Sequence, residues 1–115
     1  MNIQALLKAT SREEALRLLH SSLPNTEEPQ ELAAGLDACA DAVREFHHAF
    51  SHPVADSPVN LSEERAIKRS GWMLEELEEF TTAETVVDRA DAMIDLIYFA
   101  LGTLVEMGVQ PGKLF

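Results

Sequence analysis

The sequence has a single cysteine and few basic residues, and each shortage excludes a class of protein. With Cys39 alone, no disulfide can form within the chain, and a reducing, cytoplasmic setting is expected. Nine lysine and arginine residues face twenty acidic ones, and the formal charge of −11 argues against unaided binding to nucleic acid or an anionic membrane. A phosphate-bearing ligand would be repelled unless a metal ion or a local basic patch stood between them.

Long apolar runs and strand patterns are also missing. A membrane-spanning helix needs about 18 apolar residues in a row, and no such run is present. The segment 1–7 has no basic region followed by an apolar run, so a signal peptide is not expected. The alternation typical of strands is absent. For 115 residues, a single-domain length, we therefore expect an all-α helical bundle completed by dimerisation, as a dimer or a dimer of dimers.

Apolar residues at steps of three and four predict the helices. Short helices over 2–8 and about 10–20 would form an N-terminal extension over 1–30. The main domain, 31–115, begins with a helix of about five turns, followed by a loop at 51–58. The apolar stripe of this helix comprises Leu32, Leu36, Cys39, Val43, Phe46 and Phe50.

Two further helices are predicted in the second half of the chain. A capping box formed by Asn60 and Glu63 begins a helix to about Phe80. A second box at 81–84 begins a helix that Gly108 is placed to stop. This last helix is apolar on most of its circumference, which predicts that it is buried. The turn between the two helices is short, so they should pack as an antiparallel hairpin.

Acidic residues lie on one face of each helix of this hairpin. Glu76 and Glu79 lie one turn apart on the first helix, and Asp91 and Asp95 share a narrow face of the second. Like charges this close repel each other, and buried carboxylates must be paired, protonated or bound to metal. Opposed faces would bring the four together, where they suit Mg²⁺ or Mn²⁺. A metal-bound water could then attack phosphorus, with a spare carboxylate as base.

Three runs of the sequence resemble the all-α nucleoside triphosphate pyrophosphohydrolases, the MazG-like and phosphoribosyl-ATP pyrophosphohydrolase-like group. Residues 72–80, Trp-Met-Leu-Glu-Glu-Leu-Glu-Glu-Phe, look like the EExxE helix of that group, and 91–103 resemble its second acidic helix. Residues 43–50 are similar to the N-terminal helix of one subgroup. The resemblance covers about residues 40–115. It implies a MazG-like fold and cleavage of an (d)NTP to the monophosphate and pyrophosphate.

The resemblance also implies roles for individual residues. Glu76, Glu79 and Asp95 match the catalytic, Mg²⁺-holding residues of the group. The group has a further Glu three residues before the matched Asp, where this chain has Ala92, and Asp91 could substitute for it with a shorter reach. Many relatives also continue with a nucleotide-contacting segment beyond the position of Phe115.

The candidates for substrate contact are Arg69, Trp72, His48 and Tyr98. Arg65 and Arg69 could equally grip phosphates or balance the carboxylates. For Trp72 the sequence favours a core or dimer contact over stacking on a base, and for Tyr98 packing is as good an interpretation as substrate contact. Cys39 is expected in the core, and Glu106 is expected at the surface near a helix end.

Three functions compete at this point. The first is a Mg²⁺-dependent nucleotide pyrophosphohydrolase. The second is a non-catalytic helical dimer of the same fold that binds nucleotide or a protein partner, which Ala92 and the ending at Phe115 favour. The third is a di-iron bundle, suggested by the ExxH pattern of Glu45 and His48; such a bundle wants two of these patterns and the sequence has one.

Overall fold

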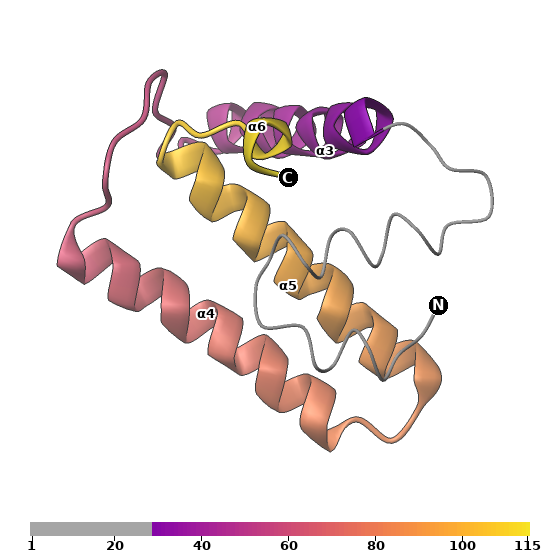
Figure 1. The fold of residues 1–115 in the computed structure, drawn as a ribbon. Coiled ribbons are helices and arrows are strands. Elements are labelled where there is room, and N and C mark those ends of the chain that lie inside the picture. The colour runs from indigo at the N-terminus through magenta and orange to yellow at the C-terminus, as the bar shows by residue number, and fades with distance from the viewer. Residues whose placement is uncertain (1–28) are drawn as a thin grey trace, which may run out of the picture.

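The computed structural model describes the backbone of residues 29–115 and the side chains of residues 31–115. The helices predicted over 2–8 and 10–20 lie outside these residues. Three long helices and a short one are present, α3 (Pro29–Ala49), α4 (Glu63–Thr82), α5 (Val86–Glu106) and α6 (Pro111–Leu114) (Figure 1). The predicted all-α class is confirmed for the described part of the chain, which contains no strand. None of the helices described is long and apolar enough to cross a membrane.

Hydroxyl side chains fix where α4 and α5 begin. Ser62 accepts a hydrogen bond from the backbone N–H of Arg65 at 3.1 Å, so Ser62 is the N-cap of α4 and the prediction of Asn60 was wrong. Thr85 does the same for the N–H of Asp88, also at 3.1 Å. The predicted cap Thr81 lies instead within the last turn of α4.

The end of α5 is set by a glycine. Gly108 has a φ of +67°, the left-handed conformation that commonly follows a helix, so the predicted stop is confirmed. A side chain at this position would also collide with the backbone carbonyl of Ser57. The short helix α6, which the sequence did not predict, is tied to α3 because Asp37 Oδ1 accepts a hydrogen bond from the Gly112 N–H at 2.8 Å.

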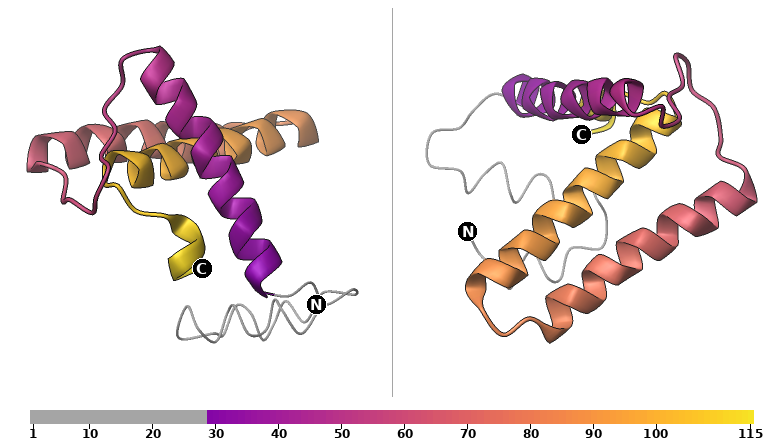
Figure 2. Two further views of the ribbon diagram at one scale, coloured as in Figure 1. Left: turned by 90° about the horizontal axis from the view of Figure 1, so that it is seen from above. Right: turned by 180° about the vertical axis from the view of Figure 1, so that it is seen from behind.

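Helices α4 and α5 form the predicted antiparallel hairpin, joined by the turn at 83–85 (Figure 1). Helix α3 crosses the C-terminal half of α5, and the loop over 50–62 returns the chain from α3 to α4 (Figure 2). The buried core lies at this crossing, between α3 and α5. It comprises Ala40, Val43, Leu101 and Val105.

The buried face of α3 differs from the predicted stripe. Ala40, Val43 and His47 are buried, whereas Cys39 is exposed and Phe50 is 63% exposed. The core assignment of Cys39 was therefore wrong. The reason is that Ala40 and Val43, rather than Cys39, lie on the face of α3 that packs against α5.

Helix α5 is less buried than predicted. Its C-terminal half packs against α3 and α4, but Val86 is 85%, Ile94 63% and Ile97 52% exposed. The prediction of a helix buried around most of its circumference was wrong for the single chain. Within the described residues, only two long helices contact α5, and they leave one apolar side of it uncovered.

Candidate functional site

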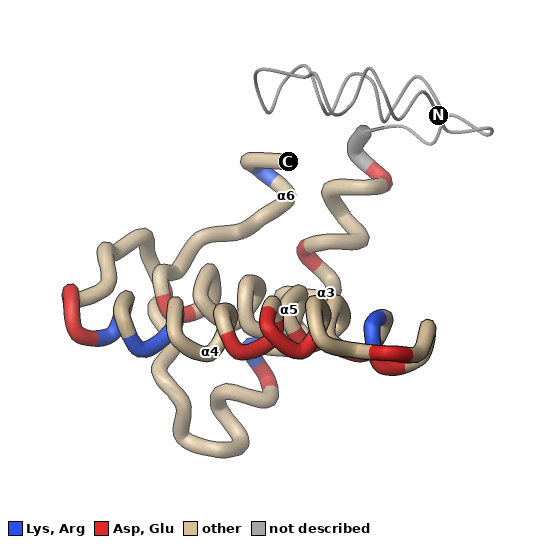
Figure 3. Tube along the Cα trace, turned by 90° about the horizontal axis from the view of Figure 1, so that it is seen from below, with Lys and Arg blue, Asp and Glu red and all other residues tan. Residues whose placement is uncertain are grey.

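Three carboxylates meet between α4 and α5. Glu76 and Glu79 come from successive turns of α4, and Asp95 comes from α5. Each offers an oxygen, and these oxygens all lie within 4.8 Å of one another. Figure 3 shows how the charges are ordered along α4: acidic positions in its first turn, basic positions after them, and a second run of acidic positions beyond.

Glu76 is the most confined of the three. The residue is 9% exposed, and its Oε2 is buried without a hydrogen-bond partner. Burial raises the pKa of Glu76, and the neighbouring Glu79 and Asp95 raise it further. A carboxylate in such surroundings is stabilised either by a proton or by a cation. A divalent ion that prefers oxygen ligands fits this donor set.

Asp91 does not belong to this group. Its side chain is exposed one turn before Asp95, and it is absent from the set of converging oxygens. Ala92 is 1% exposed in the helix interface, so the position at which the family resemblance leads one to expect a glutamate is filled by a small buried side chain. The structure thus brings together three of the four predicted metal ligands.

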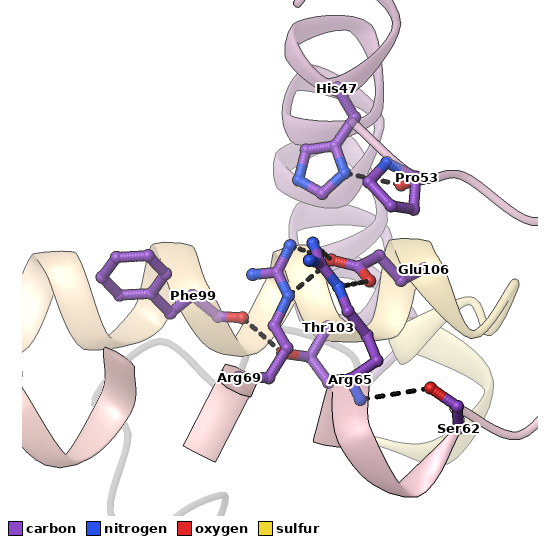
Figure 4. Close-up of polar contacts among 8 residues, drawn as sticks. All are labelled: His47, Pro53, Ser62, Arg65, Arg69, Phe99, Thr103 and Glu106. Carbon is purple, nitrogen blue, oxygen red and sulfur yellow. Dashed lines mark hydrogen bonds and ion pairs between the residues drawn. The ribbon is translucent and has the colours of Figure 1, made fainter. Parts of the chain in front are cut away.

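Glu106 forms a buried ion-pair cluster with two arginines of α4 (Figure 4). Its Oε1 accepts from Arg65 Nε at 2.7 Å, its Oε2 accepts from Arg65 Nη2 at 3.0 Å, and Oε2 also pairs with Arg69. Glu106 is 4% and Arg69 3% exposed, so the expected surface position of Glu106 was wrong. Burial acts to raise the pKa of Glu106, but the two arginines outweigh it and the pKa is lowered.

His47 lies beside this cluster in a fixed orientation. Its Nδ1 is 2.8 Å from the Pro53 carbonyl oxygen, and the residue is 2% exposed. A carbonyl only accepts, so Nδ1 carries the proton and donates. Burial lowers the pKa of His47, the bond to Pro53 opposes this, and the charge of Arg69 lowers the pKa again. The ring is therefore neutral at pH 7.

A pocket of about 210 Å³ opens beside His47 and Arg69. Of the four predicted substrate contacts, Arg69, Trp72 and Tyr98 line it, whereas His48 is exposed and does not. Arg65 and Arg69 lie 5.2 and 5.0 Å from the ring of Trp72, within cation–π range. The residues that line the pocket are His47, His52, Arg69, Trp72, Tyr98 and Phe99.

The site follows a constant register along the hairpin. Glu76 pairs with Asp95, the Trp72 ring lies 5.9 Å from the Phe99 ring, and Arg65 pairs with Glu106. In each pair, the α5 residue lies three residues farther from the turn at 83–85 than its α4 partner does. The carboxylate group is consequently one helical turn from the pocket, and the ion-pair cluster lies beyond the pocket.

Sequence reasoning did not find His47, Phe99 or the buried role of Glu106. A signal for the last two was present, because a short turn fixes which residues of an antiparallel hairpin face each other. Once Glu76 is set opposite Asp95, the same register places Phe99 opposite Trp72 and Glu106 opposite Arg65. His47 had no such signal, since it comes from α3, which crosses the hairpin at an angle that the sequence does not state (Figure 2).

Comparison with known proteins identifies the family. The model of the phosphoribosyl-ATP pyrophosphohydrolase family matches residues 43–115, more than half of the chain, and the protein belongs to this family. It is thus a pyrophosphohydrolase, a hydrolase that acts on phosphoanhydride bonds of nucleotides. No curated protein and no solved structure gives a significant match to the chain.

Proposed function

We propose that the protein is a Mg²⁺- or Mn²⁺-dependent nucleoside triphosphate pyrophosphohydrolase that cleaves an (d)NTP to the monophosphate and pyrophosphate. The observation that carries this proposal is the convergence of Glu76, Glu79 and Asp95 within 4.8 Å, with a buried Glu76 oxygen that lacks a partner. Family membership supplies the reaction class, and the convergence of these carboxylates supports the proposal that the reaction takes place beside them.

The three carboxylates would hold the ion. When bound, a divalent ion neutralises triphosphate charge and activates water. Asp91, exposed one turn before Asp95 on α5, would supply a fourth oxygen at the periphery of the site. On this proposal water attacks the α-phosphorus, the bond from that phosphorus to the α–β bridging oxygen breaks, and pyrophosphate leaves. Of Glu76, Glu79 and Asp95, a carboxylate with a spare oxygen takes the proton of the attacking water.

The adjoining pocket would take the nucleoside. Trp72 and Phe99 offer aromatic faces for a flat ring, and Tyr98 lies at the side. The pocket and the carboxylates are one helical turn apart, so a base in the first would leave its phosphates beside the second. Arg69 lines the pocket on the side of the ion-pair cluster, and the net positive charge of that cluster lowers the repulsion that a protein of net charge −11 exerts on a triphosphate. His47 takes the substrate contact that the sequence suggested for His48.

The uncovered apolar side of α5 supports a homodimer, or a dimer of such dimers. Val86, Ile94 and Ile97 are each more than half exposed, and Ile67 of α4 is 66% exposed. Large apolar side chains left exposed in this number are typical of an interface between protein chains. Light scattering on the purified protein should give at least twice the mass of 12.7 kDa. A monomer at micromolar concentration would contradict this part of the proposal.

A panel of ribo- and deoxyribonucleoside triphosphates, with Mg²⁺ or Mn²⁺ and with chelator, tests the catalytic proposal. We expect metal-dependent release of pyrophosphate from at least one substrate. Glu76→Gln and Asp95→Asn should lower the rate by at least a hundredfold, whereas Glu78→Gln, an exposed carboxylate on the same helix, should not change it. A folded protein that releases no pyrophosphate from any substrate would leave the non-catalytic, nucleotide-binding alternative.

A further inference from the structure

Two residues that line the pocket, Arg69 and His47, bring a hydrogen-bond donor and a hydrogen-bond acceptor to the same glycine of α5. A Cβ built on Gly102 would be 3.1 Å from Arg69 Nη1 and 3.1 Å from His47 Nε2. Both nitrogens therefore approach the same bare backbone position of α5. They belong to the two most buried residues that line the pocket, at 3% and 2% exposure.

The surrounding contacts fix which nitrogen donates and which accepts. Arg69 is bound to Glu106 through Nε and Nη2, and Nη1 is turned away from Glu106 (Figure 4). A guanidinium carries only donors. The His47 ring donates from Nδ1 to the Pro53 carbonyl, so its Nε2 carries a lone pair and accepts.

We infer that Arg69 Nη1 and His47 Nε2 together recognise the edge of a nucleobase that presents an acceptor next to an N–H. Each common base has such an edge, in which a carbonyl oxygen or ring nitrogen lies beside an amino group or ring N–H. His47 is then a specificity-determining residue, because it requires the N–H. This inference rests on the proposed function in one respect, that the pocket takes the nucleoside part of the substrate.

Pairs of ligands that differ only in this N–H provide the test. AMP and purine riboside monophosphate differ in the amino group, as do CMP and pyrimidin-2-one riboside monophosphate. Monophosphates are not cleaved, so binding is measured apart from turnover. Trp72 is the single tryptophan of the chain and lines the pocket, so its fluorescence reports occupancy directly. With Mg²⁺ present, we expect the ligand without the amino group to bind about ten- to a hundredfold more weakly, because it leaves a buried acceptor unpaired.

The variant His47→Asn has no acceptor at the position of Nε2 and keeps an amide N–H near the position of Nδ1. This variant should bind both members of a ligand pair equally. The two dissociation constants are compared as a ratio within the same variant, so a general loss of affinity does not affect the result. Equal binding by the wild-type protein, unchanged discrimination in His47→Asn, or unchanged Trp72 emission with every monophosphate would each overturn the inference. Discrimination in binding without turnover of any triphosphate would support it while contradicting the catalytic proposal.

Discussion

Neutralising Glu106 should destabilise the protein strongly. In Glu106→Gln the side-chain volume is kept, but Arg69, at 3% exposure, is left as a buried cation without a counter-charge. Removing one partner of a buried ion pair typically costs about 3–5 kcal/mol. We expect the lower end, because the Arg65 side chain is 24% exposed and keeps access to water. For a chain of this length about 3 kcal/mol corresponds to a fall in melting temperature of about 12 °C.

Asp56→Asn is the matched control for this experiment. Its ion pair with Arg44 has the same N···O distance of 2.7 Å as the pair of Arg65 with Glu106, but the Asp56 side chain is 97% exposed. An exposed pair contributes about 0–1 kcal/mol. Urea unfolding followed by circular dichroism, at one fixed protein concentration, measures both variants. If the two lose the same small amount of stability, burial is not what gives the Glu106 cluster its importance.

Three further measurements test other parts of the structure. Mg²⁺ or Mn²⁺ at about a hundred times Kd should stabilise the wild-type protein by about 2.7 kcal/mol, and should stabilise Asp95→Asn much less. If the wild-type protein has the same melting temperature with and without metal, the ion site is excluded. Gly71→Ala should stabilise α4 by up to about 1 kcal/mol, because no atom lies within 4 Å of the added Cβ. In Gly102→Ala this gain should be lost, because the added Cβ would lie 3.1 Å from two side-chain nitrogens. Equal stabilities of the two variants would contradict the packing at Gly102. Because the pKa of His47 is lowered in the folded protein, the imidazole is protonated more readily in the unfolded chain, and the free energy of unfolding should fall as the pH drops below about 6.5. When unfolding is measured at pH 8, 6 and 5, the fall should be smaller in His47→Gln.

The hairpin could be predicted from the sequence because its determinants are local. Apolar periodicity located α4 and α5, and the conformational freedom of Gly108 marked the end of α5. The N-caps shifted by two to four residues because several hydroxyl and amide side chains precede each helix, and only the backbone geometry selects among them. Helix α6 has four residues, too few for a periodic pattern to be recognised.

The carboxylate group was predictable for the same reason, and the pocket was only partly so. Glu76 and Asp95 face each other through the hairpin register, which chain order determines. The direction in which α3 crosses α5 depends on tertiary packing, so the sequence could not tell whether His47 or His48 turns inward. Glu106 was misplaced because a charged residue near a helix end is usually solvated, and its partner Arg65 is 41 positions away.

The turn at 83–85 has a consequence for how this family member can change over evolution. Converging carboxylates, aromatic rings and buried charges are matched across one pair of helices. Adding a single residue to α5 between the turn and Asp95 would therefore rotate the rest of that helix by about 100°. Such a change would separate every matched pair at once. The loop over 50–62 leads into α4 ahead of every matched pair, and we expect insertions or deletions between related sequences to accumulate there instead.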